Sequence, residues 1–360
     1  MADESGTYST ASGRVGVGAS RGCPAELHFD VHTARRGPPS SSASSRGPPS
    51  SSASSPVRHP VLCVMGFLTD GAQFWPQLET LCQRGHTVCT FDNRGVGRSS
   101  ATLPPYTTAQ MACDALELLE YLGWTPETTH LIGMSMGGMI ALEMLAGSKK
   151  IKRDRRGRVF QSASLLVTTP TGPVHNPFPW RWGGPPLSTF VSTFRQLFDP
   201  TLSEREASLM AMGLNFRRDW LLRDSGLQHP RTGEPMTNMK RVMRAGTKIW
   251  FAKKNDGVDP RTGWRGIVGH MCAVATHHVG RRRLDAIRNS GCPLLVVGVT
   301  DDKLVAHEYG SEQLFRSLQP FESVVLESGH GVNMECEAEV NAAILRLFAA
   351  SEQRLIRAAL

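Results

Sequence analysis

The chain has 360 residues, a formal net charge of +8 at pH 7, 40% hydrophobic residues and 20% charged residues. This length allows one large core with an added subdomain, and the composition is that of an ordinary globular protein. No apolar run approaches the roughly 18 residues that cross a bilayer, so no transmembrane segment is predicted. The N-terminal residues include early acids and no apolar stretch, which argues against a secretory signal and leaves an organellar transit peptide as an open alternative.

The eight cysteines form no Cys-x-x-Cys pair and have no histidine at zinc-site spacing. Several stand in apolar runs, where a free cysteine behaves as a small hydrophobic residue. We therefore expect reduced cysteines without a disulfide framework, and from them a cytoplasmic location. Neither a metal nor a cofactor is expected.

Much of the positive charge lies in two basic runs, at 149–158 and at Arg281–Arg283. A nucleic-acid-binding patch would combine such a run with aromatic residues and with the signature of a nucleic-acid-binding fold. The first run has no interleaved aromatic residue, and the chain has no such signature. We expect no nucleic-acid partner, and interpret the runs as a solvated loop and the start of a basic helix.

The N-terminal region is predicted to contain little fixed structure. Residues 1–24 are expected to be disordered, and the alternating pattern of residues 25–35 predicts an edge strand. The decamer that begins at Arg36 is repeated letter for letter from Arg46. Its proline and serine cannot bury enough apolar surface to offset the entropy of ordering, so residues 36–56 are predicted to be a disordered insert.

Strand and helix patterns alternate through residues 57–170, the first part of the expected core. Thr107 or Thr108 can cap the second helix, and Gly123 can end it. Short strand–helix–strand connections predict parallel pairing in a doubly wound α/β sheet, with the active site at the carboxyl ends of its strands. The predicted strands are 61–65, 86–91, 130–132 and 164–168.

The alternation is lost over residues 171–283, which are rich in Trp, Met and Phe and contain Pro and Gly breaks. We expect a mostly helical lid, whose Trp and Met side chains line an apolar substrate pocket or form the lid's own core. The core pattern returns over residues 284–350, and residues 351–360 are expected to be a C-terminal tail. The later core elements are a strand at 293–299, a helix at 311–318, a strand at 323–326 and a terminal helix from about Glu335.

A Gly-x-Ser-x-Gly motif follows the strand at 130–132 and places Ser135 between Gly133 and Gly137. In a nucleophile elbow the serine lies at the tip of a tight strand-to-helix turn, where side chains larger than glycine would collide with the backbone. The motif alone is short enough to occur by chance. Its position between a strand and a helix makes Ser135 a candidate nucleophile.

A serine nucleophile needs a base within hydrogen-bond reach, and the base needs a carboxylate that orients it. His330 follows the last predicted strand and is the candidate base. Two candidate acids, Asp301 and Asp302, follow the preceding strand. The negative charge that develops on the substrate oxygen needs two donors, for which the backbone N–H groups of Phe67 and Met136 are the candidates.

With these features, the chain resembles an α/β-hydrolase-fold protein over roughly residues 57–350. Each motif is weak alone, whereas five in the right order between the right strands are specific. The resemblance implies a Ser/Asp/His triad that acts on esters or related acyl substrates. The motifs that carry it are Gly66-Phe67, the segment from Phe91 to Ser99, Gly133 to Gly138, the Asp301/Asp302 turn and Gly329-His330.

The sequence also departs from the commonest pattern of this family. Met65 stands where a histidine is frequent, which removes a supporting side chain but leaves the backbone donors. Counting from the strand end favours Asp301 as the acid, whereas the Lys-Leu-Val-Ala segment after Asp302 matches the family better, so Asp302 is preferred. The lid segment Val274 to His278 is similar to one in a plant, algal and fungal subgroup.

Other polar residues have a structural interpretation. Asp92 and Arg94 belong to the resembling segment, where this turn usually positions the loop beside the nucleophile. His277 and His278 are expected to make ordinary polar contacts in the lid. No role is assigned to His270.

The predicted function is a metal-free serine hydrolase that cleaves a carboxylic ester or related acyl bond of a small apolar substrate through an acyl-enzyme intermediate. One alternative is a non-hydrolytic small-molecule receptor or scaffold on the same fold. An acyltransferase or a carbon–carbon-bond hydrolase is the other. The oligomeric state stays open.

Overall fold

The computed structural model describes residues 7–35, 58–147, 159–173, 175, 201–258 and 262–357. The predicted insert at 36–56 and the basic run at 149–158 lie outside these described residues. Within the described ranges, none of the helices combines the length and apolar character needed to span a membrane.

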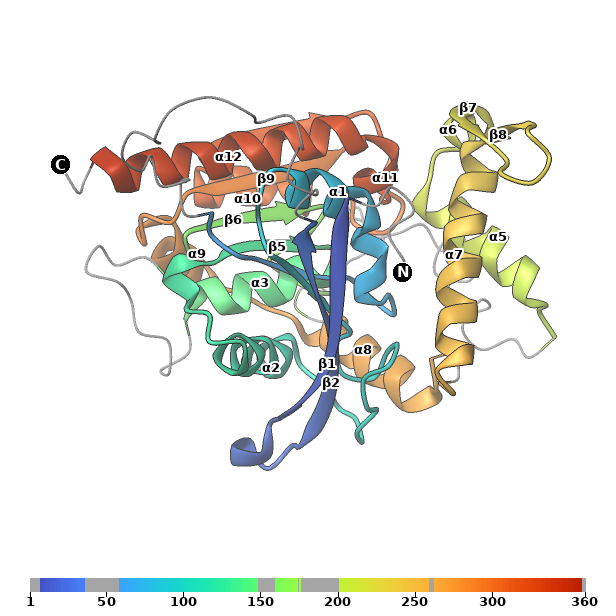
Figure 1. The fold of residues 1–360 in the computed structure, drawn as a ribbon. Coiled ribbons are helices and arrows are strands. Elements are labelled where there is room, and N and C mark those ends of the chain that lie inside the picture. Colours follow the sequence, from blue (N-terminus) through green and yellow to red (C-terminus); the bar gives the residue numbers. More distant parts are fainter. Residues whose placement is uncertain are drawn as a thin grey trace, which may run out of the picture.

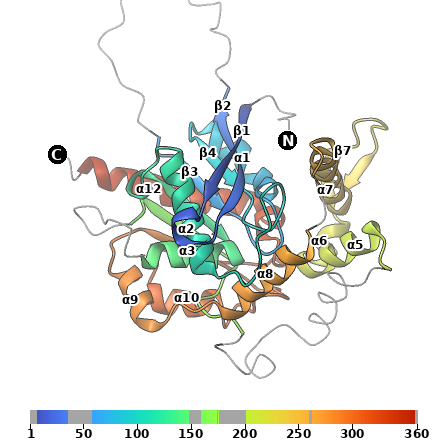
Figure 2. The ribbon, with the colours of Figure 1, turned by 90° about the horizontal axis from the view of Figure 1, so that it is seen from below.

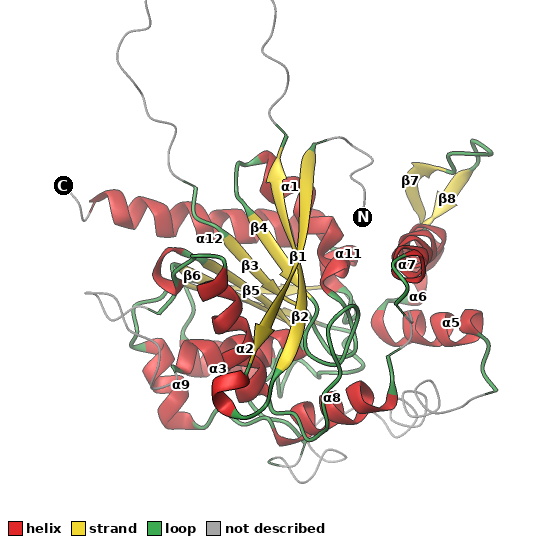
Figure 3. Ribbon diagram, turned by 60° about the horizontal axis from the view of Figure 1, so that its bottom comes forward, coloured by secondary structure: helices red, strands yellow, loops and turns green. Residues whose placement is uncertain are grey.

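Among the described residues, eight strands form one mixed sheet at the centre of the fold (Figures 1 and 3). They are β1 (Tyr8–Val17), β2 (Ala25–Ala34), β3 (Val61–Val64), β4 (Val88–Phe91), β5 (His130–Met134), β6 (Ser162–Leu166), β9 (Leu294–Val299) and β10 (Glu322–Leu326). Their order across the sheet is β1-β2-β4-β3-β5-β6-β9-β10. β2 pairs antiparallel with β1 and with β4, and all pairs from β4 to β10 are parallel. The predicted doubly wound, mostly parallel α/β architecture is confirmed.

Helices cover both faces of this sheet, as Figure 1 shows for α12 on one side and α2 and α3 on the other. The first face carries α1 (Trp75–Gln83), α11 (Val332–Glu335) and α12 (Glu337–Arg357), and the second carries α2 (Thr108–Tyr121), α3 (Met136–Ala146), α9 (Arg281–Arg288) and α10 (Ser311–Leu318). Thr107 caps α2 by accepting from the Gln110 N–H, and Gly123 follows its end with φ of 69°. Short 3-10 helices lie at Ala19–Arg21, Gly71–Phe74 and Pro126–Thr128.

The prediction that residues 1–24 are disordered was wrong for the described residues 7–24. β1 pairs with β2 along its whole length, and the buried side chains of Tyr8, Val15 and Val17 fix it to the core. β1 is therefore the edge strand, and β2 lies inside the sheet. The Gly/Ser/Thr-rich sequence of β1 carries a weak strand signal of its own, because its stability comes from pairing with β2 and from tertiary packing.

The segment predicted to be a lid lies beside the sheet (Figures 1 and 2), and its described part is mostly helical. Residues 174, 176–200 and 259–261 of the predicted lid lie outside the described part of the chain. Met212, Phe216 and Leu221 form a small apolar cluster with Met334 of the core, so part of the apolar content forms the lid's own core. Its described elements are α5 (Glu204–Asn215), α6 (Arg218–Leu222), α7 (Asn238–Asn255) and α8 (Trp264–Thr276), with a hairpin of β7 (Asp224–Gln228) and β8 (Pro235–Thr237).

Two boundaries of the second core part differ slightly from the prediction. α9 begins at Arg281, so the Arg281–Arg283 run is the start of a basic helix, as expected. α12 continues to Arg357, and most of the predicted C-terminal tail is therefore helix. The buried side chain of Ser351 lies in this extension, which keeps the last turns of α12 against the fold.

Candidate active site

Ser135 lies in the turn between β5 and α3 with φ of 56° and ψ of −122°, a backbone conformation that residues other than glycine rarely adopt. A Cβ atom at Gly137 would lie 1.9 Å from the Val64 carbonyl oxygen, and one at Gly133 would lie 2.5 Å from the Gly137 oxygen. The turn can therefore close only with glycine at both positions. The backbone has the tight strand-to-helix turn expected of an elbow, and Ser135 lies at its tip, at the carboxyl end of the central strand β5.

The two predicted oxyanion donors lie beside this serine. A Cβ atom at Gly66 would be 3.1 Å from the Ser135 Cβ, so the end of β3 directly adjoins the elbow. Phe67 follows Gly66, and Met136 is the first residue of α3, where backbone N–H groups have no partner within the helix. Within the described residues, the structure records no acceptor for the N–H of either residue. Both groups can donate to an anionic oxygen near Ser135.

His330 is paired with Asp302. Its Nδ1–H donates to Asp302 Oδ2 at 2.7 Å, and the two side chains are 5% and 1% exposed. The other carboxylate oxygen of Asp302 accepts the N–H groups of Leu304 and Val305, both at 2.8 Å. These bonds fix the carboxylate, which in turn fixes the tautomer of the imidazole and leaves His330 Nε2 able to accept a proton.

The three predicted triad residues follow strands of the same parallel set: Ser135 follows β5, Asp302 follows β9 and His330 follows β10. The carboxyl ends of parallel strands lie at one edge of a sheet, where α/β sheets place their ligands. Within the described residues the structure records no hydrogen bond between the Ser135 hydroxyl and His330. Such bonds are often long in ligand-free structures and shorten when substrate binds.

Asp301 has a different position and different partners. Its side chain is 53% exposed and lies 3.4 Å from the Arg217 guanidinium. Arg217, at the start of α6, also binds the carboxylate of Glu327 at 2.7 Å, and its backbone N–H donates to Glu335. Asp301 therefore takes part in the junction between lid and core, and only Asp302 contacts His330.

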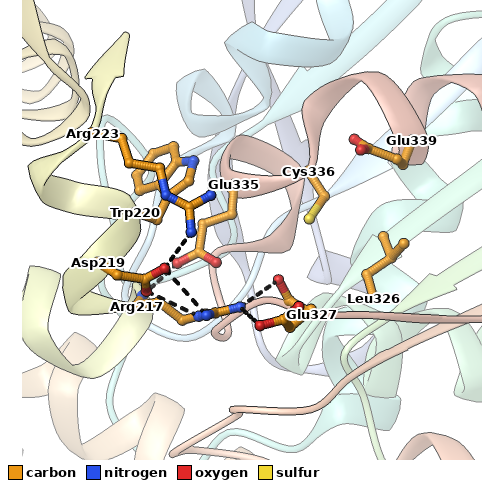
Figure 4. A pocket seen from close by; sticks show the side chains of 9 residues that line it. All are labelled: Arg217, Asp219, Trp220, Arg223, Leu326, Glu327, Glu335, Cys336 and Glu339. Carbon is orange, nitrogen blue, oxygen red and sulfur yellow. Dashed lines mark hydrogen bonds and ion pairs between the residues drawn. The ribbon is translucent and has the colours of Figure 1, made fainter.

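The same junction contains a charged pocket of about 260 Å³ between α6 and the segment that connects β10 to α11 (Figure 4). Glu335 links the two sides of the pocket. Its carboxylate accepts the N–H of Arg217 at the start of α6 and, at 3.0 Å, the N–H of Gly329 in the β10–α11 connection. None of the three triad residues is among the residues that line it. They are Arg217, Asp219, Trp220, Arg223, Leu326, Glu327, Glu335, Cys336 and Glu339.

His270 of α8 lies beside the candidate site, although no motif in the sequence indicated a role for it. It is completely buried, and its Nδ1 accepts the N–H of Leu68 at 3.1 Å while its Nε2–H donates to the Arg94 carbonyl at 2.9 Å. Burial lowers the pKa of His270 to about 4, so the imidazole is neutral and can both accept and donate. Leu68 has φ of 55° and directly follows Phe67. His270 therefore holds the backbone next to one candidate oxyanion donor.

The resembling segment around Asp92 and Arg94 makes structural contacts. Asp92 accepts the N–H groups of Gly71 at 3.0 Å and Arg98 at 2.7 Å, and burial raises the pKa of its carboxyl. The fully buried Arg94 guanidinium binds the carboxylate of Asp114 at 2.5 and 2.8 Å. These bonds hold the turn beside the nucleophile, in agreement with the structural interpretation.

His277 makes a polar contact of the kind expected, whereas the recorded side-chain contact of His278 is with another ring. His277 Nδ1 lies 2.8 Å from the Thr108 hydroxyl, and burial lowers the pKa of His277 to about 3. His278 is exposed, with its ring centroid 4.8 Å from that of His175.

Residues 59–335 match the alpha/beta hydrolase fold family. The chain belongs to this family. The fold is also that of a hydrolase from Pseudomonas aeruginosa PA01, with a TM-score of 0.61, 20% identity and coverage of 93% of this chain and 97% of the other. An enol-lactonase from Burkholderia xenovorans LB400 has a TM-score of 0.59, 18% identity and coverage of 90% and 97%. At these identities the likeness extends to the fold alone.

Several curated relatives of this alpha/beta hydrolase match only over shorter segments. Rhodomycin D methylesterase DnrP of Streptomyces peucetius is 38% identical over 90 residues, which is 24% of this chain and 29% of that protein. Relatives that match at 36–42% identity are covered over only 29–34% of their length. The comparisons support hydrolase activity in general. They do not support the narrower assignment to a plant, algal and fungal subgroup.

Proposed function

We propose that this alpha/beta hydrolase is a serine hydrolase that cleaves a carboxylic ester or related acyl bond of a small apolar substrate. The observation that carries the proposal is the Asp302–His330 pair at the same sheet edge as the Ser135 elbow. A strained serine, an oriented imidazole and two free backbone donors are the parts that acyl transfer requires.

In the proposed reaction, His330 Nε2 accepts the proton of the Ser135 hydroxyl as its oxygen attacks the acyl carbon. The N–H groups of Phe67 and Met136 stabilise the oxyanion that forms, and Asp302 stabilises the imidazolium. His330 then donates its proton to the leaving alkoxide, which leaves an acyl-enzyme on Ser135. Water activated by His330 releases the acid and restores the serine.

The names of curated relatives support hydrolysis of an ester or a related acyl bond. One relative is a methylesterase, and others carry the name carbamate hydrolase RutD. The apolar character proposed for the substrate comes from the Trp and Met content of the lid. The cytoplasmic location and the subgroup indicated by Val274 to His278 stay predictions of the sequence.

The proposal is tested by measuring release of p-nitrophenol from p-nitrophenyl acetate, butyrate and octanoate, with methanol as a competing acceptor. We expect saturable turnover that greatly exceeds the rate without enzyme. Predominant transfer of the acyl group to methanol at low methanol concentration would favour the acyltransferase alternative. Saturable binding of the esters without turnover would contradict the proposal and favour a receptor.

The proposed oxyanion site gives a prediction for His270. Its replacement by Gln removes one or both bonds that hold Leu68 to Arg94, so we expect kcat to fall about 10-fold to 100-fold. KM should change less, because the affected contact stabilises the transition state rather than the bound substrate. The measurement is steady-state kinetics with p-nitrophenyl butyrate.

His32→Gln is a matched control for this prediction. His32 is also buried, burial lowers its pKa to about 4, and it bonds the hydroxyl of Thr90 inside the sheet. We expect His32→Gln to lose about as much stability as His270→Gln and to keep the kcat of the unmodified chain. Equal losses of kcat in the two variants would mean that His270 acts only through stability.

A further inference from the structure

At the opposite edge of the sheet from Ser135, two buried histidines and a glutamate face one another. His86 lies two residues before the start of β4, His130 is the first residue of β5, and Glu352 lies in the last turns of α12. Each side chain offers one ligand atom, and these atoms all lie within 4.8 Å of one another. Ser135 is five residues further along from His130, or about 17 Å of extended strand. The cluster is therefore separate from the candidate active site.

Both imidazoles are held in place by the surrounding fold. His86 Nδ1–H donates to the His59 carbonyl at 2.9 Å, and His130 Nδ1 lies 2.8 Å from the Ser162 hydroxyl. The His130 ring also stacks on Phe348, with centroids 3.8 Å apart and planes at 11°. Histidines that bind metals commonly make such a hydrogen bond with the second ring nitrogen, which leaves the first nitrogen for the metal.

Two polar atoms of this cluster, one from His130 and one from Glu352, lack a hydrogen-bond partner within the described part of the chain, and a bound cation would take the place of that partner. Among the residues that the structure describes, the buried atoms His130 Nε2 and Glu352 Oε1 have no hydrogen-bond partner, and they lie 3.8 Å apart. His130 is completely buried, whereas the second oxygen of Glu352 is bound by Arg58 at 2.7 Å. Buried polar atoms without a partner are unfavourable and call for an explanation.

We propose that His86, His130 and Glu352 form a structural site for one divalent cation of the Zn²⁺ type. Two imidazole nitrogens and one carboxylate oxygen are a donor set that Zn²⁺ accepts, whereas Mg²⁺ and Ca²⁺ prefer oxygen ligands. Tetrahedral bonds of about 2.0–2.2 Å place ligand atoms about 3.4 Å apart, so ligand atoms that lie within 4.8 Å of one another need to approach by up to about 1.4 Å. Water, or the neighbouring imidazole of His59, supplies the fourth ligand.

The site joins elements that are distant in sequence. A cation would tie the last turns of α12 to the starts of β4 and β5, which supports the fold rather than the chemistry at Ser135. Arg58 holds the glutamate oxygen that the cation does not use, as is usual for a ligating carboxylate, and its positive charge lowers the affinity for a cation. The inference does not depend on the proposed hydrolase function.

The test uses the full chain without a histidine tag, treated with a chelator and then titrated with ZnCl₂ or MgCl₂. We expect one equivalent of Zn²⁺ to bind, with a Tm increase of about 5 °C at a free concentration 100 times Kd. MgCl₂ should give no increase, and ester turnover should be the same with and without Zn²⁺. The variants Glu352→Gln and His86→Gln are expected to lose both the bound equivalent and the Tm increase.

His229→Gln is the control, because His229 is a partly exposed histidine in the β7–β8 connection of the lid, away from His86, His130 and Glu352 in the sequence. It should retain Zn²⁺ binding and the Tm increase. Co²⁺ titration of the unmodified chain gives a second measurement if the variants do not fold, with the intense visible absorption of tetrahedral Co²⁺ expected. Absence of that absorption, absence of saturable Zn²⁺ binding, or unchanged binding in Glu352→Gln would overturn the proposal.

Discussion

Replacement of Ser135 by Ala is expected to lower kcat for p-nitrophenyl butyrate by about 10⁶-fold, to the limit of detection. The variant has no side-chain oxygen to attack the acyl carbon, so the acyl-enzyme cannot form. The oxyanion donors and the binding surface stay in place, and a residual rate of up to about 10³–10⁴ over water is compatible with their action. The measurement is initial rates at saturating ester, corrected for hydrolysis without enzyme.

Ser9→Ala is a suitable control for the serine prediction. Ser9 is exposed on the edge strand β1, where its hydroxyl bonds that of Thr33. This variant should keep the kcat of the unmodified chain. Thermal unfolding of both variants separates loss of catalysis from loss of structure, and an unchanged kcat in folded Ser135→Ala would exclude the proposed mechanism.

Asp302→Asn is expected to lower kcat by about 10⁴-fold. An amide can still accept the N–H groups of Leu304 and Val305, so the loop can keep its conformation. It stabilises the imidazolium of His330 poorly, and its NH₂ group can select the wrong tautomer. Steady-state kinetics together with the thermal unfolding midpoint distinguish this effect from unfolding.

Asp301→Asn is the matched control for Asp302→Asn. Asp301 is exposed and contacts Arg217 at 3.4 Å, a surface ion pair that contributes about 0–1 kcal/mol to stability. We expect Asp301→Asn to change kcat by no more than a few fold. If Asp301→Asn were the inactive variant and Asp302→Asn the active one, the assignment of the acid would be reversed.

The parts of this fold that depend on local sequence were predictable. Apolar runs marked the buried parallel strands, and Thr107 and Gly123 marked the ends of α2 through backbone chemistry. The elbow at Ser135 was predictable for the same reason, because the tight turn requires glycine at fixed positions on both sides. The order of strand ends then indicated that the serine, acid and histidine share one edge.

The parts that depend on distant contacts were not predictable. β1 has little apolar sequence, and its order comes from pairing with β2. The segment after Asp302 already favoured this residue as the acid, but the separate contacts of Asp301 and Asp302 depend on Arg217 and His330, which come from other parts of the chain. His270 had no signal, because its partners Leu68 and Arg94 lie about 200 and 176 positions away in the chain.

The histidine–glutamate cluster is the extreme case of such distant contacts. His86, His130 and Glu352 come from two strand starts and the terminal helix, and no motif spacing connects them. Zinc-site motifs are recognisable in sequence when two ligands stand a few residues apart. Here each ligand is alone in its segment, so only the folded sheet brings the three together.

The most direct test of the central claim is covalent labelling of the full chain with a fluorophosphonate, followed by mass spectrometry of the intact protein and of its peptides. Attack by the activated serine displaces fluoride and leaves one phosphonyl group on the enzyme. We predict one adduct per chain, on Ser135, with loss of ester turnover in proportion to labelling. Labelling of another residue, or full turnover in a completely labelled protein, would contradict the account.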